Sequence, residues 1–327
     1  SEEHISKAIF ELQQVATNFS DGSYTTNKNV YSKLRNGVKV KVSAGKNYDT
    51  VKLINWQDPK DNDFYIAEEV TLKVNKTKRP DIVLYINGIA IAVLELKRGI
   101  VDIGEGIRQN ITNMQDRFIQ PFFATNQILF AGNDAEGLRY GTISSPEKFY
   151  LSWKEDVEDN SRLLLDKYLL KMCSKERIIE LLYDFIVFDA GIKKLPRAHQ
   201  YFGVKESQKY VNRSEGGIIW HTQGSGKSIS MVYLAKWILE NNPKARVAIV
   251  TDRDELDKQI EDVFTDSDEI ILRTKSGKDL MNKLGQPSPR LLCSLVHKFG
   301  SKDVANFEKY LKELSENPVQ VSGELFV

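Results

Sequence analysis

The chain has 327 residues and a formal net charge of +1, so its charge neither favours nor excludes a nucleic-acid partner. Hydrophobic residues make up 41% of the sequence and charged residues 28%, which is typical of a soluble globular protein with room for two domains. Two cysteines far apart and four scattered histidines exclude a zinc framework and favour a reducing compartment. No apolar run is long enough to span a membrane and the first residues lack a signal-peptide pattern, so we expect a cytoplasmic protein without a membrane partner.

The first 150 residues are expected to form a mixed sheet flanked by helices. Near the start, HISKAIFELQQVA has apolar residues at helical spacing, which predicts a helix. Residues 22 to 63 look irregular or rich in β-structure, because VKVKV and YDTVKLINW alternate as strands do. Further along we expect a strand or strand pair in FYIAEEVTLKVN, a hairpin over residues 80 to 99, a helix around GEGIRQNITNMQDRF and a strand in NQILFAGN.

Residues 151 to 195 show a helical apolar period, and we interpret them as a helical connector with Ser174 as a helix N-cap. Beyond them, helical stretches alternate with short apolar segments, which is the pattern of an open parallel sheet. These segments are GGIIW, KARVAIVT, DEIIL and PRLLCSL. The last residues, GELFV, read as the start of a buried strand, so we expect a fragment or the ordered part of a longer protein.

A glycine-rich loop is the strongest functional signal in the chain. The predicted strand 217–220 leads into Gly224-Ser225-Gly226-Lys227-Ser228, and a helix follows at once. Glycines let backbone N–H groups close around a phosphate, and the helix N-terminus adds partial positive charge. Lys227 is expected to reach the β- and γ-phosphates of ATP, and the Ser228 hydroxyl to bind Mg²⁺.

The three residues before this loop indicate which kind of nucleotide-binding protein it belongs to. His221 stands where the full pattern has glycine, a relaxed position that argues against a small-nucleotide kinase rather than against ATP. Thr222 and Gln223 complete the predicted ATP-binding segment. The alternative is an ordinary glycine turn that caps a helix.

The hairpin over residues 80 to 99 carries charged residues at the ends of apolar strands. Its turn, Asn87-Gly88, brings Asp81 toward Glu95, and two neighbouring carboxylates repel unless a cation such as Mg²⁺ lies between them. Lys97 follows on the same face as Glu95 and is suited to orient an attacking water. The pattern predicts metal-assisted phosphodiester hydrolysis. The alternative is that these are ordinary charged residues at strand ends.

The register of the hairpin decides between these alternatives. A strict two-residue turn would pair Asp81 with Leu94 and point its side chain away from Glu95. A three-residue loop over residues 86–88, with Gly88 in the left-handed conformation, would place both carboxylates on one face. We therefore predict a bulge of this kind.

A basic run, KVNKTKRP, precedes the hairpin and contains Lys73, Lys76, Lys78 and Arg79. Such a run is able to hold a DNA backbone by charge attraction. Alternatively, it is simply a solvated charged segment, which is the more common role of a charge run.

The combination resembles the motor and nuclease subunit of type I restriction enzymes over nearly the whole chain. In NDFYIAEEVTLKVNKTKRPDIVLYINGIAIAVLELKRG, the residues Asp81, Glu95 and Lys97 match the PD-(D/E)xK pattern of that family. IIWHTQGSGKS is similar to its first helicase motif, and VAIVTDRDELDKQI matches the next through Asp252-Arg253-x-x-Leu256-Asp257. LLCSLVHKF lies where a further motor motif is expected.

The resemblance implies an α/β architecture with three parts. These are a mixed-sheet PD-(D/E)xK endonuclease domain over residues 1–150, the helical connector over 151–195, and a partial RecA-like parallel motor lobe over 196–327. It also implies ATP and Mg²⁺ as cofactors, and double-stranded DNA, methyltransferase and specificity subunits as partners. The activity would be that of a type I site-specific deoxyribonuclease subunit, which moves along DNA and cuts it.

Further residues are assigned only through the resemblance. Gln109 matches a glutamine that bears on the nuclease site, whereas Asn113 stands where the family commonly has tyrosine. Glu11 is the one candidate for an upstream glutamate that sometimes adds a metal ligand. Gln200, with Arg197 beside it, matches an adenine-reading glutamine, the alternative being an ordinary residue at a helix start. The D-E-x-H box is absent, so we expect this chain alone neither to hydrolyse ATP nor to translocate.

Two other functions remain compatible with the sequence. One is a different helicase–nuclease fusion, from DNA repair or another restriction class, which would share both sites. The other is a DNA- or partner-binding module whose hairpin acids are structural.

Overall fold

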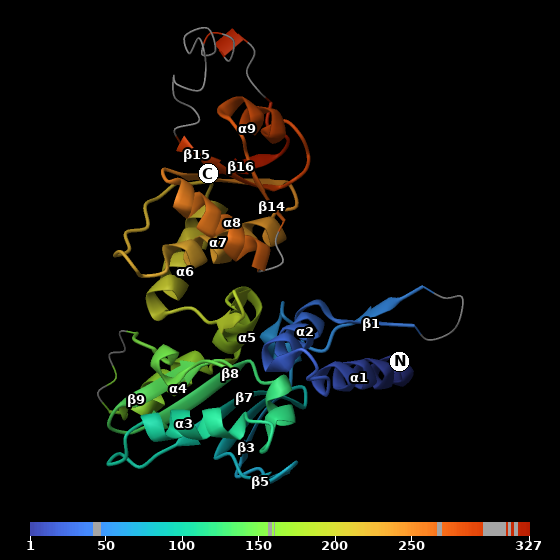
Figure 1. Ribbon diagram of the computed structural model, residues 1–327, viewed down its shortest axis with the longest axis vertical. Coiled ribbons are helices and arrows are strands. Elements are labelled where there is room, and N and C mark those ends of the chain that lie inside the picture. The colour runs from blue at the N-terminus through green and yellow to red at the C-terminus, as the bar shows by residue number, and fades with distance from the viewer. Residues whose placement is uncertain are drawn as a thin grey trace. The chain divides into compact units, whose positions relative to one another are not determined.

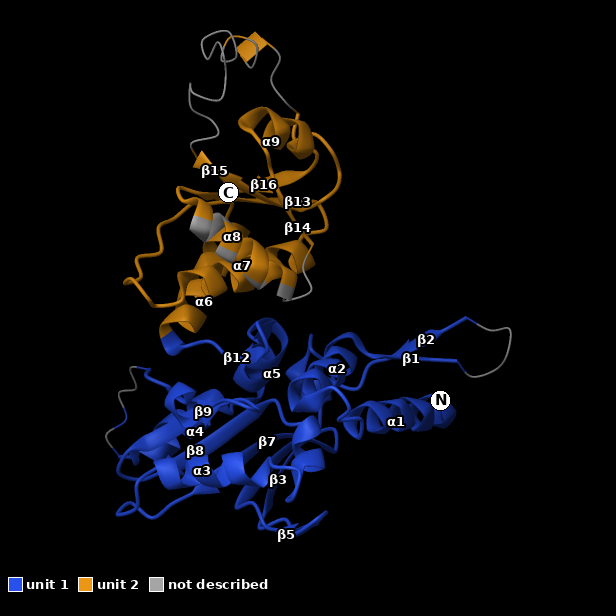
Figure 2. Ribbon diagram, viewed as in Figure 1, with its two compact units in different colours: residues 1–198 blue, residues 199–327 orange. Residues whose placement is uncertain are grey.

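The computed structural model describes residues 1–41, 47–155, 159, 161–266, 270–296, 312, 315–316 and 320–327. The chain forms two compact units, residues 1–198 and residues 199–327 (Figure 2). Both are mixed α/β structures, the first built on a mixed sheet and the second on a parallel sheet. Within the described ranges, no helix is long and apolar enough to cross a membrane.

The first unit is built on a six-stranded sheet with the order β10-β9-β8-β7-β6-β3 (Figure 1). Only β7 and β8 are parallel to each other, because helix α3 (Gly104–Asn113) connects them and returns the chain to the same edge. The strands are β3 (Phe64–Glu68), β6 (Ile82–Ile86), β7 (Ile89–Leu96), β8 (Ile128–Asn133), β9 (Gly137–Gly141) and β10 (Leu151–Ser152). Every residue of β8 is buried, as expected for a central strand.

Four other helices and three small hairpins surround this sheet. The helices are α1 (Glu2–Ala16), α2 (Gly22–Asn36), α4 (Leu164–Met172) and α5 (Lys175–Asp184). The hairpins are β1 (Val38–Val40) with β2 (Asp49–Val51), β4 (Leu72–Lys73) with β5 (Thr77–Lys78), and β11 (Val187–Asp189) with β12 (Ile192–Lys194). The predicted Ser174 cap is confirmed, since its side chain accepts a hydrogen bond from the Arg177 backbone N–H.

Helix α2 corrects the prediction of irregular or β-rich structure at its position. Its buried face mixes polar and apolar side chains: Thr26, Asn27, Val30, Tyr31 and Leu34. Asn27 is fully buried and donates hydrogen bonds to the carbonyl oxygens of Ala124 and Asn126, both at 2.9 Å. Because part of the buried face is polar, a hydrophobic period does not reveal this helix.

The stretch interpreted as purely helical also contains a hairpin. Helix α5 ends at Asp184, and residues 187–189 and 192–194 then pair as β11 and β12. Ala190 and Gly191 form the turn between these strands, both with a positive φ, as short hairpins require.

Lys193 of β12 is a buried amine in this unit. Its Nζ donates hydrogen bonds to the amide oxygens of Asn27 and Gln127 and lies 5.7 Å and 5.5 Å from the ring centroids of Tyr31 and Phe188. Burial lowers the pKa of Lys193 well below its usual value. The side chain therefore joins α2, the start of β8 and β12 through one small polar network.

Lys193→Met is expected to destabilise the first unit by about 2–4 kcal/mol, because two buried amide oxygens lose their donor. At pH values between the lowered pKa of Lys193 in the folded chain and its pKa of about 10.4 in the unfolded chain, only the unfolded chain carries the proton on this amine. Native stability therefore rises with pH across that range. The variant should lose this rise. Urea unfolding, followed by hydrogen exchange of first-unit peptides at two pH values, measures both effects. The exposed Lys39→Met is the control, and an equal loss in both variants would contradict the network.

The second unit has a parallel sheet with the order β14-β15-β13-β16, as the alternating pattern predicted. Its strands are β13 (Ala245–Thr251), β14 (Ile271–Arg273), β15 (Leu291–Leu295) and β16 (Glu324–Phe326). Its helices are α6 (Ala198–Asn212), α7 (Lys227–Asn241), α8 (Asp254–Asp266) and α9 (Gly277–Leu284). Val232, Tyr233, Ala235 and Ile238 of α7 are buried, as are all residues of β13 except the exposed Val250.

Two strand predictions in this unit need correction. Residues 217–220 form no strand, and the side chains of Ile218 and Trp220 are 89% and 90% exposed. An apolar segment becomes a strand only when a neighbour pairs with its backbone, and the described part of this sheet pairs no strand with the free edge of β16. β16 itself forms as predicted, but its residues are exposed or half-buried rather than buried.

Candidate functional site

The hairpin of β6 and β7 closes through a two-residue turn. Ile86 pairs with Ile89, and both Asn87 (φ 50°) and Gly88 (φ 77°) are left-handed. The predicted three-residue loop is therefore wrong. Asn87 tolerates this conformation because its side chain is anchored, donating to the Leu53 carbonyl at 2.9 Å and accepting from the Asp63 N–H at 2.8 Å.

A bulge nevertheless shifts the register, as the carboxylate hypothesis requires. Tyr85 pairs with Ala90 but Leu84 pairs with Ala92, so Ile91 is an extra residue in β7. Toward the open end of the hairpin Ile82 then pairs with Leu94, the outermost pair, and continuing this register by one residue would place Asp81 opposite Glu95. A bulge of the kind the site needs thus exists inside β7, whereas the bulge predicted at the turn does not form.

The carboxyl groups of Asp81 and Glu95 meet at the open end of this hairpin. Asp81 Oδ2 accepts a hydrogen bond of 2.7 Å from the Leu96 N–H, while Glu95 is fully buried. Burial, together with the charge of Asp81 and a hydrogen bond to it, raises the pKa of Glu95 to about 8, against the opposing effects of the Lys97 charge and the Asn113 amide. At neutral pH this pair therefore requires either a proton or a cation.

Helix α3 supplies two amides to the same carboxylate. Gln109 Nε2 donates to Glu95 Oε2 at 2.5 Å, and Gln109 Oε1 accepts from Lys97 Nζ at 2.7 Å. One turn later, Asn113 Nδ2 lies 3.4 Å from Glu95 Oε1. Asn113 Oδ1 is buried and has no hydrogen-bond partner among the described residues. The structure thus brings together all four residues predicted for this site and adds Asn113.

Gly106 lets α3 lie this close to β7. A Cβ atom at this position would lie 3.2 Å from the Ala131 Cβ and 3.3 Å from the Glu95 carbonyl oxygen. Any side chain here would push the helix away from the strand and separate Gln109 from Glu95. The spacing of Gln109 and Asn113 by one helical turn was readable from the sequence, whereas this close approach was not.

The donor set fits a magnesium ion. The described residues contain no cluster of three or more histidine, cysteine, aspartate or glutamate side chains, so the protein offers the two carboxylates alone. Mg²⁺ is usually held by one or two carboxylates together with several waters. A cation between Asp81 and Glu95 would replace the proton that the pair otherwise retains. Glu11 instead faces Lys33, with 4.0 Å between its Oε2 and the lysine Nζ.

The glycine-rich loop of the second unit leads directly into α7. Gly224 and Gly226 have left-handed φ values of 75° and 84°, and α7 begins at Lys227. The Gly226 carbonyl accepts a hydrogen bond of 2.9 Å from Gln200 Nε2, and a Cβ at Gly226 would lie 2.4 Å from that nitrogen. Only glycine fits at this position, which leaves the backbone N–H groups at the start of α7 open to an anion.

Lys227 folds over the loop in this structure. Its Nζ donates to the carbonyl oxygens of His221 and Thr222 at 3.3 Å and 3.2 Å. Ser225 Oγ is buried and lacks a hydrogen-bond partner within the described ranges. The ring of His221 meets that of His199 edge-on at 5.0 Å between centroids, and burial together with the charges of His199 and Lys227 lowers the pKa of His221.

The remaining predicted nucleotide residues are placed as follows. Ser228 is half-buried in the first turn of α7, and Gln223 is exposed in the loop. Arg197 lies in the first unit, so its part in a nucleotide site stays a prediction. The side chains of Leu256 and Asp257, and residues 297–299 of the segment LLCSLVHKF, lie outside the described residues.

Comparisons with known proteins match both units. A family model for the N terminus of type I restriction enzyme R proteins matches residues 2–148, and a SWI2/SNF2 ATPase family model matches residues 199–321. The chain is 28% identical over 333 residues to the MjaIXP endonuclease subunit of Methanocaldococcus jannaschii, covering 89% of this chain and 32% of that protein. It is 29% identical over 289 residues to the type I restriction enzyme HindI endonuclease subunit of Haemophilus influenzae, with coverages of 80% and 27%.

A third relative, the type I restriction enzyme SauCOLORF180P endonuclease subunit of Staphylococcus aureus, is 25% identical over 270 residues, with coverages of 79% and 28%. The chain therefore spans about a third or less of the length of the curated relatives it matches. Each matched region contains one site: the carboxylate pair lies in the first region and the glycine-rich loop in the second.

Proposed function

Since the chain belongs to the family of type I restriction enzyme endonuclease subunits, we propose that it carries the DNA-cleaving site and an ATP-binding site of such a subunit. The observation that supports this best is the pairing of the half-buried Asp81 with the fully buried Glu95, held on one face by the bulge in β7. On this proposal the first 150 residues are a PD-(D/E)xK nuclease domain, residues 151–195 a connector, and residues 196–327 part of a RecA-like motor lobe.

The nuclease site would work through four side chains. Asp81 and Glu95 would hold Mg²⁺, which when bound polarises the reacting phosphate and lowers the pKa of a bound water. Lys97 is placed to orient that water and to balance charge beside the phosphate. Gln109 holds the carboxylate of Glu95 and the amine of Lys97 in fixed relation, because it bonds to both.

The nucleotide site would bind ATP with Mg²⁺. Lys227 is positioned to exchange its two carbonyl partners for β- and γ-phosphate oxygens, and Ser228 follows it as the Mg²⁺ ligand. Gln200 would contact the adenine side of the site together with Arg197. Double-stranded DNA is the proposed substrate, and separate methyltransferase and specificity subunits are the proposed partners.

Asp81→Asn tests the nuclease assignment directly. Removing one of two carboxylate ligands is expected to reduce plasmid cleavage by the reconstituted full-length complex by about a hundredfold, because the pair loses charge for the cation. Asp63→Asn, at an exposed position just before β3, is the matched control and should cut normally. Unchanged cleavage by Asp81→Asn would favour a DNA- or partner-binding module with structural acids.

A further inference from the structure

Three cations of the first unit gather around one aromatic ring. Lys76 Nζ and Lys78 Nζ lie 5.3 Å and 4.4 Å from the Phe118 ring centroid, and the Arg117 guanidinium carbon lies 5.1 Å from it. Lys76 and Arg117 are exposed and Lys78 is half-buried. We call Lys76, Lys78, Arg117 and Phe118 the basic platform.

The platform joins two segments that are distant in the sequence. Asn75 connects the β4–β5 hairpin to the loop after α3, since its N–H donates to the Phe118 carbonyl at 3.3 Å and its Nδ2 to the Asp116 carbonyl at 2.6 Å. Arg117 Nε donates to Gln115 Oε1 at 2.8 Å. These bonds hold the cations in a defined arrangement, unlike a freely solvated charge run.

This arrangement lacks an internal anion. A cation over an aromatic ring gains only about 0.5–1 kcal/mol at an exposed site, and three like charges around one ring repel each other. Within the described part of the chain, no carboxylate lies within ion-pair distance of these three cations. Asp116, the nearest acid in the sequence, uses Oδ1 to accept from the Arg117 backbone N–H. The charge is therefore available to an anion from outside the chain.

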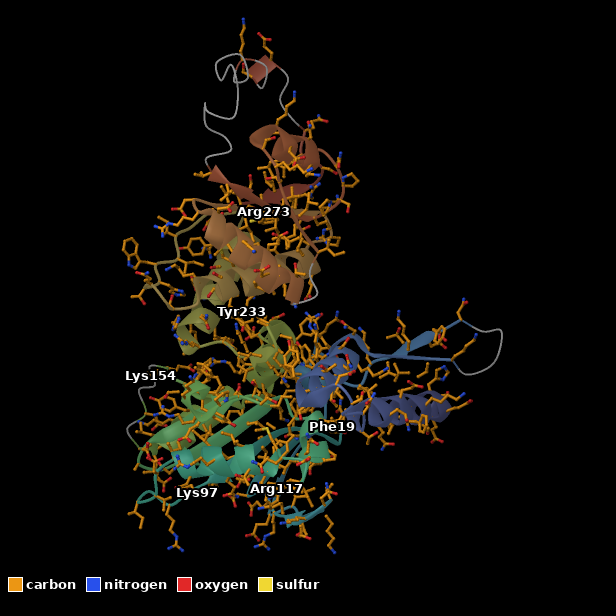
Figure 3. The ribbon with its side chains drawn as sticks, viewed as in Figure 1. Phe19, Lys97, Arg117, Lys154, Tyr233 and Arg273 are labelled. Atoms are coloured by element: carbon orange, nitrogen blue, oxygen red, sulfur yellow. The ribbon has the colours of Figure 1, made fainter. Side chains whose placement is uncertain are left out.

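Both chain segments that form the platform lie close in the sequence to residues of the carboxylate site. Asp81 follows Lys78 by three residues, which span at most about 10 Å of chain. On the other segment, Asn113, which lies against Glu95, precedes Arg117 by four residues. Lys97 bonds to Gln109 of α3, and Arg117 follows the end of that helix by four residues; Figure 3 labels both side chains. A distance of about 10 Å along the helix axis of duplex DNA corresponds to roughly three nucleotides of one strand.

We propose that the basic platform binds backbone phosphates of duplex DNA within about three nucleotides of the phosphate that reacts. This inference rests on the proposed nuclease function, because that function places a phosphodiester at the carboxylate pair. Lysine and arginine that contact phosphates fix the position of a protein on DNA without reading bases. The platform thus positions the duplex for cleavage and does not select its sequence.

The test uses the full chain without divalent metal, so that binding is measured without cleavage. The triple variant Lys76→Gln, Lys78→Gln, Arg117→Gln is titrated with a short duplex by fluorescence anisotropy over a range of salt concentrations. Affinity is expected to fall about tenfold or more, and the slope of log affinity against log salt to fall by about 2–3. Phe118→Leu, which keeps the packing but removes the ring, should give a smaller loss.

The matched control removes the same charge elsewhere in the first unit, with Lys39→Gln, Lys52→Gln and Lys60→Gln, all exposed. Equal losses in the two triple variants, an unchanged salt slope, or no duplex binding by the unsubstituted chain would overturn the proposal. So would displacement of the duplex by inorganic phosphate or an acidic peptide beyond the effect of matched ionic strength, since the platform would then be a small-anion or protein site.

The proposed nuclease function fails separately from the platform. If Asp81→Asn still cuts plasmid while the platform variant loses its salt slope, the DNA surface stands and the catalytic assignment fails. If Asp81→Asn abolishes cutting and the platform variant binds DNA normally, the reverse holds.

Discussion

Glu95→Gln is expected to reduce DNA cleavage by about a thousandfold or more, with the metal-free chain becoming more stable at neutral pH. The carboxylate is fully buried, so water cannot replace it as a ligand as it can at the half-buried Asp81. The same burial, with Asp81 alongside, makes the charged form of Glu95 unfavourable. Loss of activity together with gain of stability would distinguish a functional carboxylate from a structural one. Replacing a structural carboxylate should instead lower the stability of the folded chain.

The stability change should depend on pH in a defined way. In the folded chain the pKa of Glu95 is about 8, whereas an unfolded glutamate has a pKa of about 4.3. Between these values the folded state holds a proton that the unfolded state has lost, so native stability falls as pH rises. The total fall is on the order of 5 kcal/mol, and Glu95→Gln should remove it.

Urea unfolding at pH 5 and pH 8, with exposed Glu68→Gln as the control, measures this difference. Calorimetry gives an independent check, since Mg²⁺ binding at pH 7 should release up to one proton when Glu95 ionises. Lower stability of Glu95→Gln at pH 8, or metal binding without proton release, would contradict the raised pKa.

The fold was predictable from the sequence where the hydrophobic pattern is local. Prediction failed where an element depends on contacts with residues distant in the sequence. β13 and β15 consist mostly of apolar residues, and both strands form as predicted. α2 escaped detection because Asn27 is buried by bonds to residues about a hundred positions away. Residues 217–220 show the opposite error, since their apolar character predicted a strand that lacks a paired neighbour.

The candidate site was predictable in its residues but not in its geometry. Counting residues across the hairpin showed that an even turn would separate Asp81 from Glu95, so a bulge was required. The counting could not locate the bulge, because Asn87 closes a two-residue turn with bonds to Leu53 and Asp63 outside the hairpin. Asn113 differs from the family pattern, yet its amide reaches Glu95 from the position one turn after Gln109.

Lys227→Ala is expected to weaken ATP binding by about a hundredfold, with little effect on folding. Lys227 is exposed and, among the described residues, bonds to two loop carbonyls alone, so its removal leaves no buried group there unpaired. A charged hydrogen bond to phosphate contributes about 1.5–3 kcal/mol, and the lysine is placed to make such bonds to two phosphates. Exposed Lys244→Ala, before β13, is the control for loss of charge.

Comparing the binding of ATP, ADP and AMP tests whether Lys227 itself contacts the phosphates. If Lys227 reaches the β- and γ-phosphates, Lys227→Ala should weaken ATP and ADP binding but leave AMP binding within about twofold. An equal loss for all three nucleotides would mean that the variant disturbs the loop itself, where Gln200 bonds to Gly226. Unchanged ATP affinity would remove the assignment, because the left-handed glycines would then serve only to start α7. Equilibrium titration with each nucleotide in the presence of Mg²⁺ separates these three outcomes.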